Sequence, residues 1–546
     1  MTAAAGAPPW WKGAVVYHVY VRSFFDTDGD GYGDLPGVVA KLDYISDLGV
    51  DAIWLSPIHP SPDRDWGYDV ADFDGVHPDY GTLDDLKALV DAAHARGLKV
   101  LLDEVLSHTS DEHPWFIDSL TGGKDGPKAD WYVWADPAAD GTAPNNWLSV
   151  FGGPAWAYQP ARRQHYHHKF LRQQPKLNWR NAHAREAALQ VLDRWLAVGI
   201  DGFRLDVAGT YLHDAALTDN PPVPMGERRR HHWSHAGNLQ RHLYDSNLPE
   251  NVETLDVIRR RVDAFGDRFV FGEFSEEEER CGAYLGPDKG LHSAYTFVML
   301  LARKLGPAFV RDHYATLAAH PGHWPCISFS NHDVPRTVSR FGGDDPSPAV
   351  ARLMLALLLT LRGTALVYQG EELGLPQARL TRAQLRDPVG DLYWPYTSGR
   401  DGARTPMPWR ADAPNLGFTA GAPWLPAAPE HAGLTVDAQA ADPASTLAFA
   451  RALTALRRDH PVLRTGEIEI LAAPDPVLAF VRRDGGTAVA CVFNMGGAPA
   501  AWSDPRLADA DPLEPCSGES ALSSDTLALG PYAVRILRLP VAADPG

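Results

Sequence analysis

Short apolar runs alternate with stretches of helical periodicity between residues 15 and 374, and this alternation limits the chain to few architectures. Helical stretches at residues 83–96 and 184–198 end at Gly97 and Gly199, a residue type that favours helix termination. Strands that alternate with helices form parallel sheets, and eight such units predict a (β/α)8 barrel. The eight predicted strands are residues 15–24, 50–58, 99–108, 200–207, 268–274, 294–300, 326–333 and 365–374.

Two regions interrupt this rhythm. Residues 109–172 are rich in Pro, Trp, Asn and Gly and are too long for an ordinary loop, so we predict an inserted subdomain that walls one side of a pocket. From residue 460 the pattern changes to short strands and turns, at 467–471, 477–482, 487–493 and 533–539, which predicts a C-terminal antiparallel β-domain. The predicted domains are therefore a barrel (1–108 and 173–459), an insertion (109–172) and a β-domain (460–546).

Charge and composition narrow the classes of ligand. The formal net charge is −19, which argues against nucleic acid or an anionic membrane as a partner and favours neutral ligands. The sequence starts without an export signal and contains no apolar run long enough to cross a bilayer, so we expect a cytoplasmic protein. A zinc cluster and a disulfide framework are both unexpected, because no Cys-x-x-Cys pair occurs among Cys281, Cys326, Cys491 and Cys516.

The predicted strand at residues 200–207 ends in charge. Arg204 and Asp206 lie two positions apart, so their side chains point to the same face of the strand. We expect the guanidinium to keep the carboxylate ionised, with a lowered pKa. An ionised and oriented aspartate is suited to nucleophilic attack.

Two further strand ends carry acids. Glu273 lies among apolar residues, and desolvation there should favour its protonated form. Asp333 is a third carboxylate that is expected to bind sugar hydroxyls. Retaining hydrolysis of a glycoside needs a carboxylate nucleophile and a protonated carboxyl about 5–5.5 Å apart, and Asp206 and Glu273 are candidates for these roles.

Four short motifs resemble those of glycoside hydrolase family 13, the α-amylase family. In chain order they are residues 103–108 (Asp-Glu-Val-Leu-Ser-His), 202–206 (Gly-Phe-Arg-Leu-Asp), 272–273 (Gly-Glu) and 330–333 (Ser-Asn-His-Asp). Residues 174–178 (Gln-Pro-Lys-Leu-Asn) and 400–409 (Arg-Asp-Gly-Ala-Arg-Thr-Pro-Met-Pro-Trp) are similar to the oligo-1,6-glucosidase and α-glucosidase branch. The resemblance covers nearly the whole chain.

The resemblance implies a role for each matching residue. Asp206 is expected to be the nucleophile, Glu273 the general acid/base and Asp333 the stabiliser of the transition state. Residues of four further kinds are expected at the sugar: those lining the glucose site (His108, Arg204, His332), the residue stacking on its ring (Tyr68), a pair closing the pocket beyond one glucose (Asp65, Arg400) and aromatic walls (Phe151, Phe170, Phe297). For the three phenylalanines, ordinary core packing is an equally open interpretation.

Three positions depart from the family pattern. Ser107 stands where asparagine is usual and resembles a subgroup acting on short α-1,4 substrates, some of whose members are good glucosyl transferases. Val207, which follows the nucleophile, is instead associated with α-1,6 preference. Lys176 replaces the usual acidic residue of its motif. The linkage preference therefore stays open.

Residues 26–34 resemble most of an EF-hand calcium loop, with side-chain or backbone oxygens at the ligand spacing and Gly31 at the turn. Gly37 stands where the closing glutamate is expected, and a solvated acidic turn is the alternative. The family resemblance places a structural Ca²⁺ here, with Mg²⁺ as another possible occupant. The candidate ligands are Asp26, Asp28, Asp30, Tyr32 and Asp34.

Together these features predict a retaining exo-α-glucosidase that releases α-glucose from the non-reducing end of short α-glucosides, maltose-type or isomaltose-type, with transglucosylation. No organic cofactor is expected. The alternatives within the same family are a sucrose hydrolase or isomerase and a trehalose synthase. A remote alternative is a non-catalytic ancillary subunit on the same scaffold, which three intact carboxylates and the lack of a membrane anchor disfavour.

Overall fold

The computed structural model describes residues 8–225, 236–275, 282–286, 289–302, 304–320, 322–343 and 346–540. Within these ranges, eight parallel strands form one sheet in the order β10-β11-β1-β2-β3-β7-β8-β9. Ser293 Oγ on β9 lies 3.2 Å from Cys326 Sγ on β10, so the two outer strands meet and nearly close the barrel. The strands are β1 (Val15–Val19), β2 (Ala52–Leu55), β3 (Lys99–Glu104), β7 (Gly202–Leu205), β8 (Phe269–Phe274), β9 (Ser293–Thr296), β10 (Cys326–Ser328) and β11 (Thr364–Tyr368).

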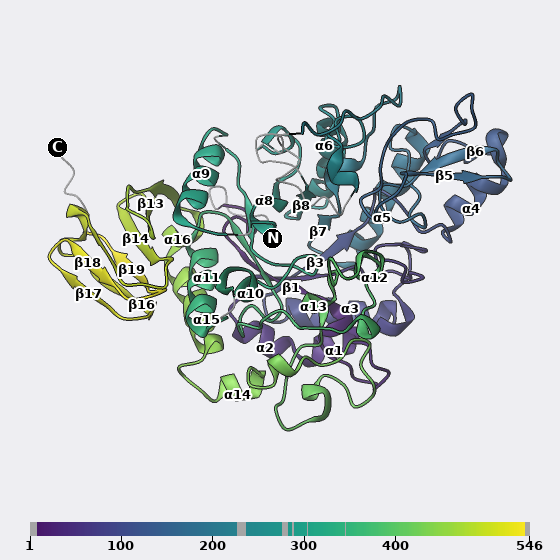
Figure 1. Cartoon of the computed structure of the whole chain (residues 1–546). Coiled ribbons are helices and arrows are strands. Elements are labelled where there is room, and N and C mark those ends of the chain that lie inside the picture. The colour runs from purple at the N-terminus through teal and green to yellow at the C-terminus, as the bar shows by residue number, and fades with distance from the viewer. Residues whose placement is uncertain are drawn as a thin grey trace.

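Helices surround the strands, as the alternating pattern predicts (Figure 1). The helix α5 shows how the sequence sets its ends: Asn181 Oδ1 caps its first turn, and Gly199 ends it in the left-handed conformation. The barrel-region helices are α1 (Leu35–Ala40), α2 (Leu42–Asp47), α3 (Leu83–His94), α5 (Ala182–Val198), α6 (Asn251–Asp263), α8 (Phe297–Leu300), α9 (Pro307–Ala318), α10 (Thr337–Gly342), α11 (Pro348–Thr360), α12 (Pro388–Tyr393), α13 (Asp401–Arg404), α14 (Val436–Ala440), α15 (Thr446–Asp459) and α16 (Pro461–Thr465).

The predicted (β/α)8 fold is confirmed, but the strands are shorter than predicted. The predicted strand at 294–300 is wrong in its second half, because β9 ends at Thr296 and the apolar residues that follow form the helix α8. A continuous apolar run is equally compatible with a buried strand and a buried helix, so periodicity cannot place this boundary.

The insertion after β3 has a sheet of its own, in the order β4-β6-β5, formed by β4 (Trp134–Ala135), β5 (Trp156–Gln159) and β6 (Gln164–His167), with α4 (Pro114–Thr121) beside it. An antiparallel bridge between His108 and Lys176 joins its two ends, and one between Tyr132 and Leu177 attaches its interior to the segment that follows. Figure 1 shows this segment at one end of the molecule and the C-terminal strands at the other.

The C-terminal region contains antiparallel sheets, as predicted. The larger one has the order β12-β13-β14-β19-β16 and includes all four predicted strands: β12 (Glu467–Ile470), β13 (Val477–Asp484), β14 (Thr487–Asn494) and β19 (Val534–Arg538), with β16 (Asp511–Ser517) at its edge. The smaller sheet, β15-β18-β17, was not predicted. Its strands are β15 (Ala500–Ser503), β17 (Ser520–Ser523) and β18 (Thr526–Leu529).

Two buried arginines meet at the end of α11, and one of them attaches the C-terminal region to the barrel. Arg482 on β13 donates to the carbonyl oxygens of Thr360 (2.6 Å) and Leu361 (3.1 Å) at the end of α11. Arg457 on α15 donates to the carbonyl oxygen of Leu359. The carboxyl end of a helix carries partial negative charge and unpaired carbonyl groups, so two cations there stabilise it.

Among the described residues, no helix combines the length and apolar character that crossing a bilayer requires. Cys326, Cys491 and Cys516 are free thiols, and Cys281 lies outside the described residues.

Candidate active site

Arg204 joins three carboxylates at the carboxyl ends of adjacent strands. Its Nη1 lies 2.6 Å from Asp103 Oδ1 and 2.8 Å from Asp206 Oδ1, and its Nη2 lies 2.5 Å from Glu273 Oε1. The strand order β3-β7-β8 and the register that pairs Asp103 with Arg204 bring these groups together. All four side chains are buried, so the guanidinium offsets charge that water cannot reach.

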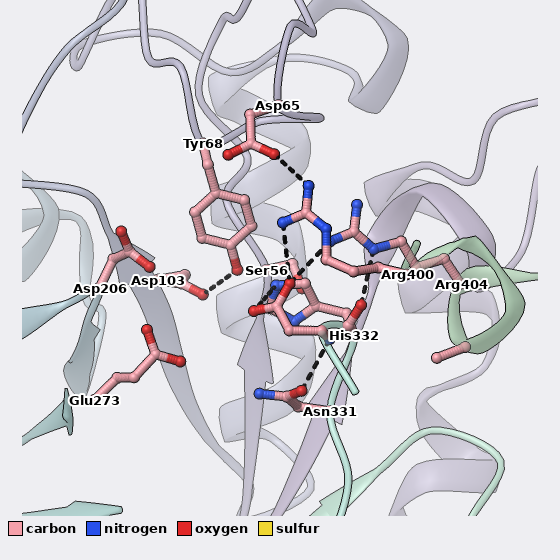
Figure 2. Close-up of polar contacts among 12 residues, drawn as sticks. Ser56, Asp65, Tyr68, Asp103, Asp206, Glu273, Asn331, His332, Arg400 and Arg404 are labelled. Atoms are coloured by element: carbon pink, nitrogen blue, oxygen red, sulfur yellow. Dashed lines mark hydrogen bonds and ion pairs between the residues drawn. The ribbon is translucent and has the colours of Figure 1, made fainter. Parts of the chain in front are cut away.

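The carboxyl groups of Asp206 and Glu273 lie on the same side of the site (Figure 2). Glu273 Oε1 accepts a hydrogen bond from Tyr295 Oη at 2.8 Å, and Glu273 Oε2 accepts one from the Val207 N–H at 3.3 Å. The prediction that Glu273 lies in apolar surroundings is therefore wrong. Arg204 on the neighbouring strand reaches both acids, a contact that only the register of β7 and β8 reveals.

The expected low pKa of Asp206 is also wrong in direction. Burial raises the pKa of Asp206 well above its ordinary value, and although Arg204 opposes this, Glu273 and Asp103 add to it. Burial also raises the pKa of Asp103, to about 7. One arginine among three carboxyls leaves excess negative charge, so the cluster retains a proton, and a retaining pair needs one carboxyl ionised and the other protonated.

Asp333 is the acid with the lowered pKa. Burial raises the pKa of Asp333, but His332, Arg400 and Arg404 outweigh this and hold it below the ordinary value. Its Oδ1 lies 2.9 Å from Arg404 Nη2 and 3.2 Å from Arg400 Nη1. Asp333 therefore carries a fixed negative charge opposite the proton-sharing acids.

Asp65 and Arg400 form the predicted pair, with Asp65 Oδ1 2.6 Å from Arg400 Nη2 (Figure 2). Sequence reasoning missed Asp387, whose Oδ1 lies 2.7 Å from the same nitrogen and whose Oδ2 accepts the Arg400 N–H at 2.6 Å. The only sequence signal was an Asp-Pro step at the start of a helix, which indicates a cap but no ligand. Asp65 and Asp387 together hold Arg400 in place.

The ring of Tyr68 stacks on that of His332, with centroids 5.2 Å apart and planes 9° apart. Tyr68 Oη donates to Asp103 Oδ2 at 3.0 Å, which orients the ring. Burial lowers the pKa of His332 to about 3, so the ring is neutral. Its Nε2 lies 3.3 Å from Asp333 Oδ2, and its Nδ1 has no hydrogen bond among the described residues.

His108 already has protein partners for both ring nitrogens. Nε2 lies 2.9 Å from the Tyr68 carbonyl oxygen and Nδ1 lies 2.7 Å from Ser107 Oγ. Burial lowers the pKa of His108 to about 3, so this ring is neutral, with Nε2 donating to the carbonyl and Nδ1 accepting from the serine. The Tyr68 carbonyl oxygen, which can only accept, thus fixes the tautomer of His108, and Ser107 donates to the other nitrogen. The contact of His108 with sugar stays a prediction.

The three predicted aromatic walls differ in their surroundings. Phe151 and Phe170 lie beside one another, with ring centroids 6.1 Å apart. Arg400 lies over the ring of Phe151, and the ring of Phe170 is 5.3 Å from that of His108, so both phenylalanines border the site. Phe297, at the start of α8, packs against a buried cluster that includes Phe271 and Tyr295, which favours the core-packing interpretation.

Comparison with known proteins identifies the family. The model of the alpha-amylase catalytic domain matches residues 18–466. The chain belongs to the α-amylase family, glycoside hydrolase family 13. Its curated relatives include a probable alpha-glucosidase of Rhizobium meliloti (strain 1021), 46% identical over 94% of each chain, and an oligo-1,6-glucosidase of Parageobacillus thermoglucosidasius, 36% identical over 86% of this chain and 87% of the relative.

Solved structures of the same family also match. The alpha-glucosyl transfer enzyme XgtA is 44% identical with a TM-score of 0.95, over 98% of this chain and 100% of that one. The trehalulose synthase MutB from Pseudomonas mesoacidophila MX-45 is 32% identical with a TM-score of 0.88 over the same shares. The chain is thus a glycoside hydrolase, and its relatives act as glucosidases and as glucosyl-transferring enzymes.

The acidic loop at residues 26–34 brings three of its five predicted ligands together. One carboxylate oxygen from each of Asp26, Asp28 and Asp34 lies within 4.8 Å of the others. Asp30 is outside this group, and the backbone oxygen of Tyr32 stays a predicted ligand. An all-oxygen set of three carboxylates suits a hard cation such as Ca²⁺ or Mg²⁺.

A second group, Asp63, His77 and Asp79, was not predicted. The buried guanidinium of Arg22 pairs with Asp63 at 2.8 Å and lies 3.6 Å from Asp79. A cationic side chain therefore already neutralises this second group.

The raised pKa of Asp206 predicts a pH dependence. If Asp206 must be ionised for attack, kcat/KM falls as the pH drops through its raised pKa. The acidic limb should then have its midpoint above about 4, the ordinary value for aspartate. The pH profile of kcat/KM on 4-nitrophenyl α-glucoside measures this, with enzyme held at each pH and assayed at neutral pH as the control for unfolding. A midpoint at or below about 4 contradicts it.

Proposed function

We propose that this protein is a retaining exo-α-glucosidase that releases α-glucose from the non-reducing end of short α-glucosides. The observation that carries the proposal is the arrangement of Asp206 and Glu273 around Arg204, closed on the far side by Asp65 and Arg400. We expect this ion pair to close the pocket beyond one terminal glucose, as the family resemblance implies, and so to exclude the middle of a chain.

We assign the two acids the roles that the family resemblance implies. Glu273 protonates the glycosidic oxygen while Asp206 attacks the anomeric carbon, which forms a covalent glucosyl-enzyme and releases the leaving alcohol. Glu273 then removes a proton from water, whose oxygen attacks the same carbon and releases α-glucose. Asp333, held ionised by Arg400 and Arg404, binds the sugar hydroxyls and stabilises the positive charge of the transition state.

Azide rescue distinguishes the two catalytic roles. With α-glucosyl fluoride, whose leaving group needs no acid, Glu273→Ala should form the glucosyl-enzyme, and azide should then yield α-glucosyl azide. Asp206→Gly should yield β-glucosyl azide instead, because azide attacks the fluoride directly from the opposite face. Product configuration is read by NMR, with wild type as the control. Interchanged products would reverse the assignments, and wild-type turnover in either variant would refute the proposal.

Glucosyl transfer is the second candidate. It is supported by the similarity to XgtA, an alpha-glucosyl transfer enzyme, and by Ser107, which hydrogen-bonds His108 and resembles the subgroup that contains glucosyl transferases. Transfer uses the same glucosyl-enzyme with a sugar hydroxyl replacing water. Sucrose isomerisation has weaker support, from MutB at 32% identity.

Linkage preference is tested by initial rates on maltose, isomaltose, sucrose and trehalose side by side. Faster release of α-glucose from maltose is expected if Ser107 sets the preference, and faster release from isomaltose if Val207 does. New disaccharides or trisaccharides at high substrate concentration would measure transfer. A higher rate on sucrose or trehalose than on both maltose and isomaltose would contradict the glucosidase assignment. It would favour the sucrose-acting or trehalose-forming alternatives of the family.

We further propose that Asp26, Asp28 and Asp34 hold a structural Ca²⁺ or Mg²⁺. The support is their mutual distance and their oxygen-only donor set. Chelation should lower the melting temperature and added Ca²⁺ restore it, by a free energy of about 2.7 kcal/mol at one hundred times Kd. Asp28→Asn should abolish this response, whereas Asp30→Asn, also exposed but outside the group, should keep it. Equal responses in both variants would refute the assignment.

A further inference from the structure

The residue that follows the nucleophile has a strained backbone. Val207 has φ 39° and ψ 47°, in the left-handed region that β-branched residues disfavour. Such strain costs about 1–3 kcal/mol and persists only where surrounding contacts enforce it. The N–H of Val207 donates to Glu273 Oε2 at 3.3 Å, so this conformation connects the nucleophile strand to the acid/base.

Residues 207–210 form a short turn after the nucleophile, and hydrogen bonds hold the carbonyl oxygen of each of these four residues. Thr210 donates to the Val207 oxygen through both its N–H and its Oγ1, each at 2.9 Å. The other three oxygens accept hydrogen bonds from outside the turn: Ala208 O from Asn251 Nδ2 at 2.8 Å, Gly209 O from Asn247 N at 2.7 Å, and Thr210 O from Lys176 Nζ. The turn is therefore held between α6, the loop before it and the segment that carries Lys176.

Lys176 is fixed independently of the turn. Its N–H donates to the His167 carbonyl oxygen at 2.9 Å, and it bridges to His108, so its backbone is anchored in the insertion. The side chain is 2% exposed and has no ion pair among the described residues. The neighbouring Lys169 takes the buried carboxylate of Asp245, at 2.7 Å.

Burying a lysine without a carboxylate partner destabilises the folded state. The ammonium group of Lys176 donates to one backbone oxygen, that of Thr210, among the described residues. The family pattern has an acidic residue at this position, which has no proton to donate to Thr210 O when ionised. The hydrogen bond from Lys176 to Thr210 therefore depends on the lysine by which this chain departs from the motif.

We propose that Lys176 is a positioning residue, which holds the turn after the nucleophile in its strained conformation and so keeps Asp206 and Glu273 aligned. The proposal rests on the catalytic roles assigned above. Asp65 and Arg400, the pair expected to close the pocket beyond one glucose, lie on other elements and do not contact the turn. Loss of the Lys176 contact therefore acts on the chemical steps and leaves ground-state glucose binding in place.

The test compares Lys176→Met with Lys176→Arg in the full chain. Misplacement by about 1 Å costs roughly a hundredfold in rate, so Lys176→Met should lower kcat on 4-nitrophenyl α-glucoside by about ten- to a hundredfold, with KM within about twofold. Lys176→Arg retains a donor and should recover part of kcat. Lys169→Met is the matched control: it removes a buried cation from the same region, so it should lower the melting temperature and keep kcat.

Lys176→Met with wild-type kcat, or a kcat loss of equal size in Lys169→Met, would overturn the proposal. If Lys176→Met does not fold, Thr210→Ala is the second variant, because it removes only the Oγ1 contact to Val207. It should show the same fall in kcat at constant KM. Wild-type kcat in Thr210→Ala would overturn the proposal. Activity in Asp206→Asn would instead refute the proposed function. An inactive Asp206→Asn together with an unaffected Lys176→Met refutes only this inference.

Discussion

Arg204 makes the active site possible, because three buried carboxyls share its guanidinium. Asp103, Asp206 and Glu273 come from three neighbouring strands, and without a cation between them their burial and mutual repulsion would oppose folding. Tyr295 and Tyr68 hydrogen-bond to members of this group and fix their orientation. The barrel thus supplies a rigid base on which a proton can be shared between two acids.

A second arginine organises the opposite wall in the same way. Arg400 joins Asp65, Asp333 and Asp387, which come from loops and short helices. Strand ends therefore carry Asp206 and Glu273, the acids assigned to bond breaking, and loops carry Asp65 and Arg400, the pair assigned to closing the glucose pocket. This division is consistent with one family that contains both glucosidases and glucosyl-transferring enzymes, since a loop can change without moving the acids.

The sequence predicted the barrel and the acids because both depend on local patterns. Alternation with period 2 places Arg204 and Asp206 on one face, and apolar runs mark all eight strands. The pairing of Arg204 with Glu273 was not predictable, because it depends on the register between two strands. Asp387 was missed because its partner is thirteen residues away across a loop. The strands β15, β17 and β18 were missed because each has only four residues, and β15 and β17 are also largely exposed, which weakens the apolar signal.

The joint between barrel and C-terminal sheet has a consequence for how this family member can diverge. Arg457 and Arg482 recognise backbone oxygens at the end of α11, and backbone oxygens are the same whatever side chains the helix carries. Side chains along that helix can therefore be substituted without loss of these hydrogen bonds, provided that the helix ends at the same residue. Insertions or deletions there are a different matter, since they would shift the acceptors away from both guanidinium groups. The junction thus tolerates substitution and constrains length.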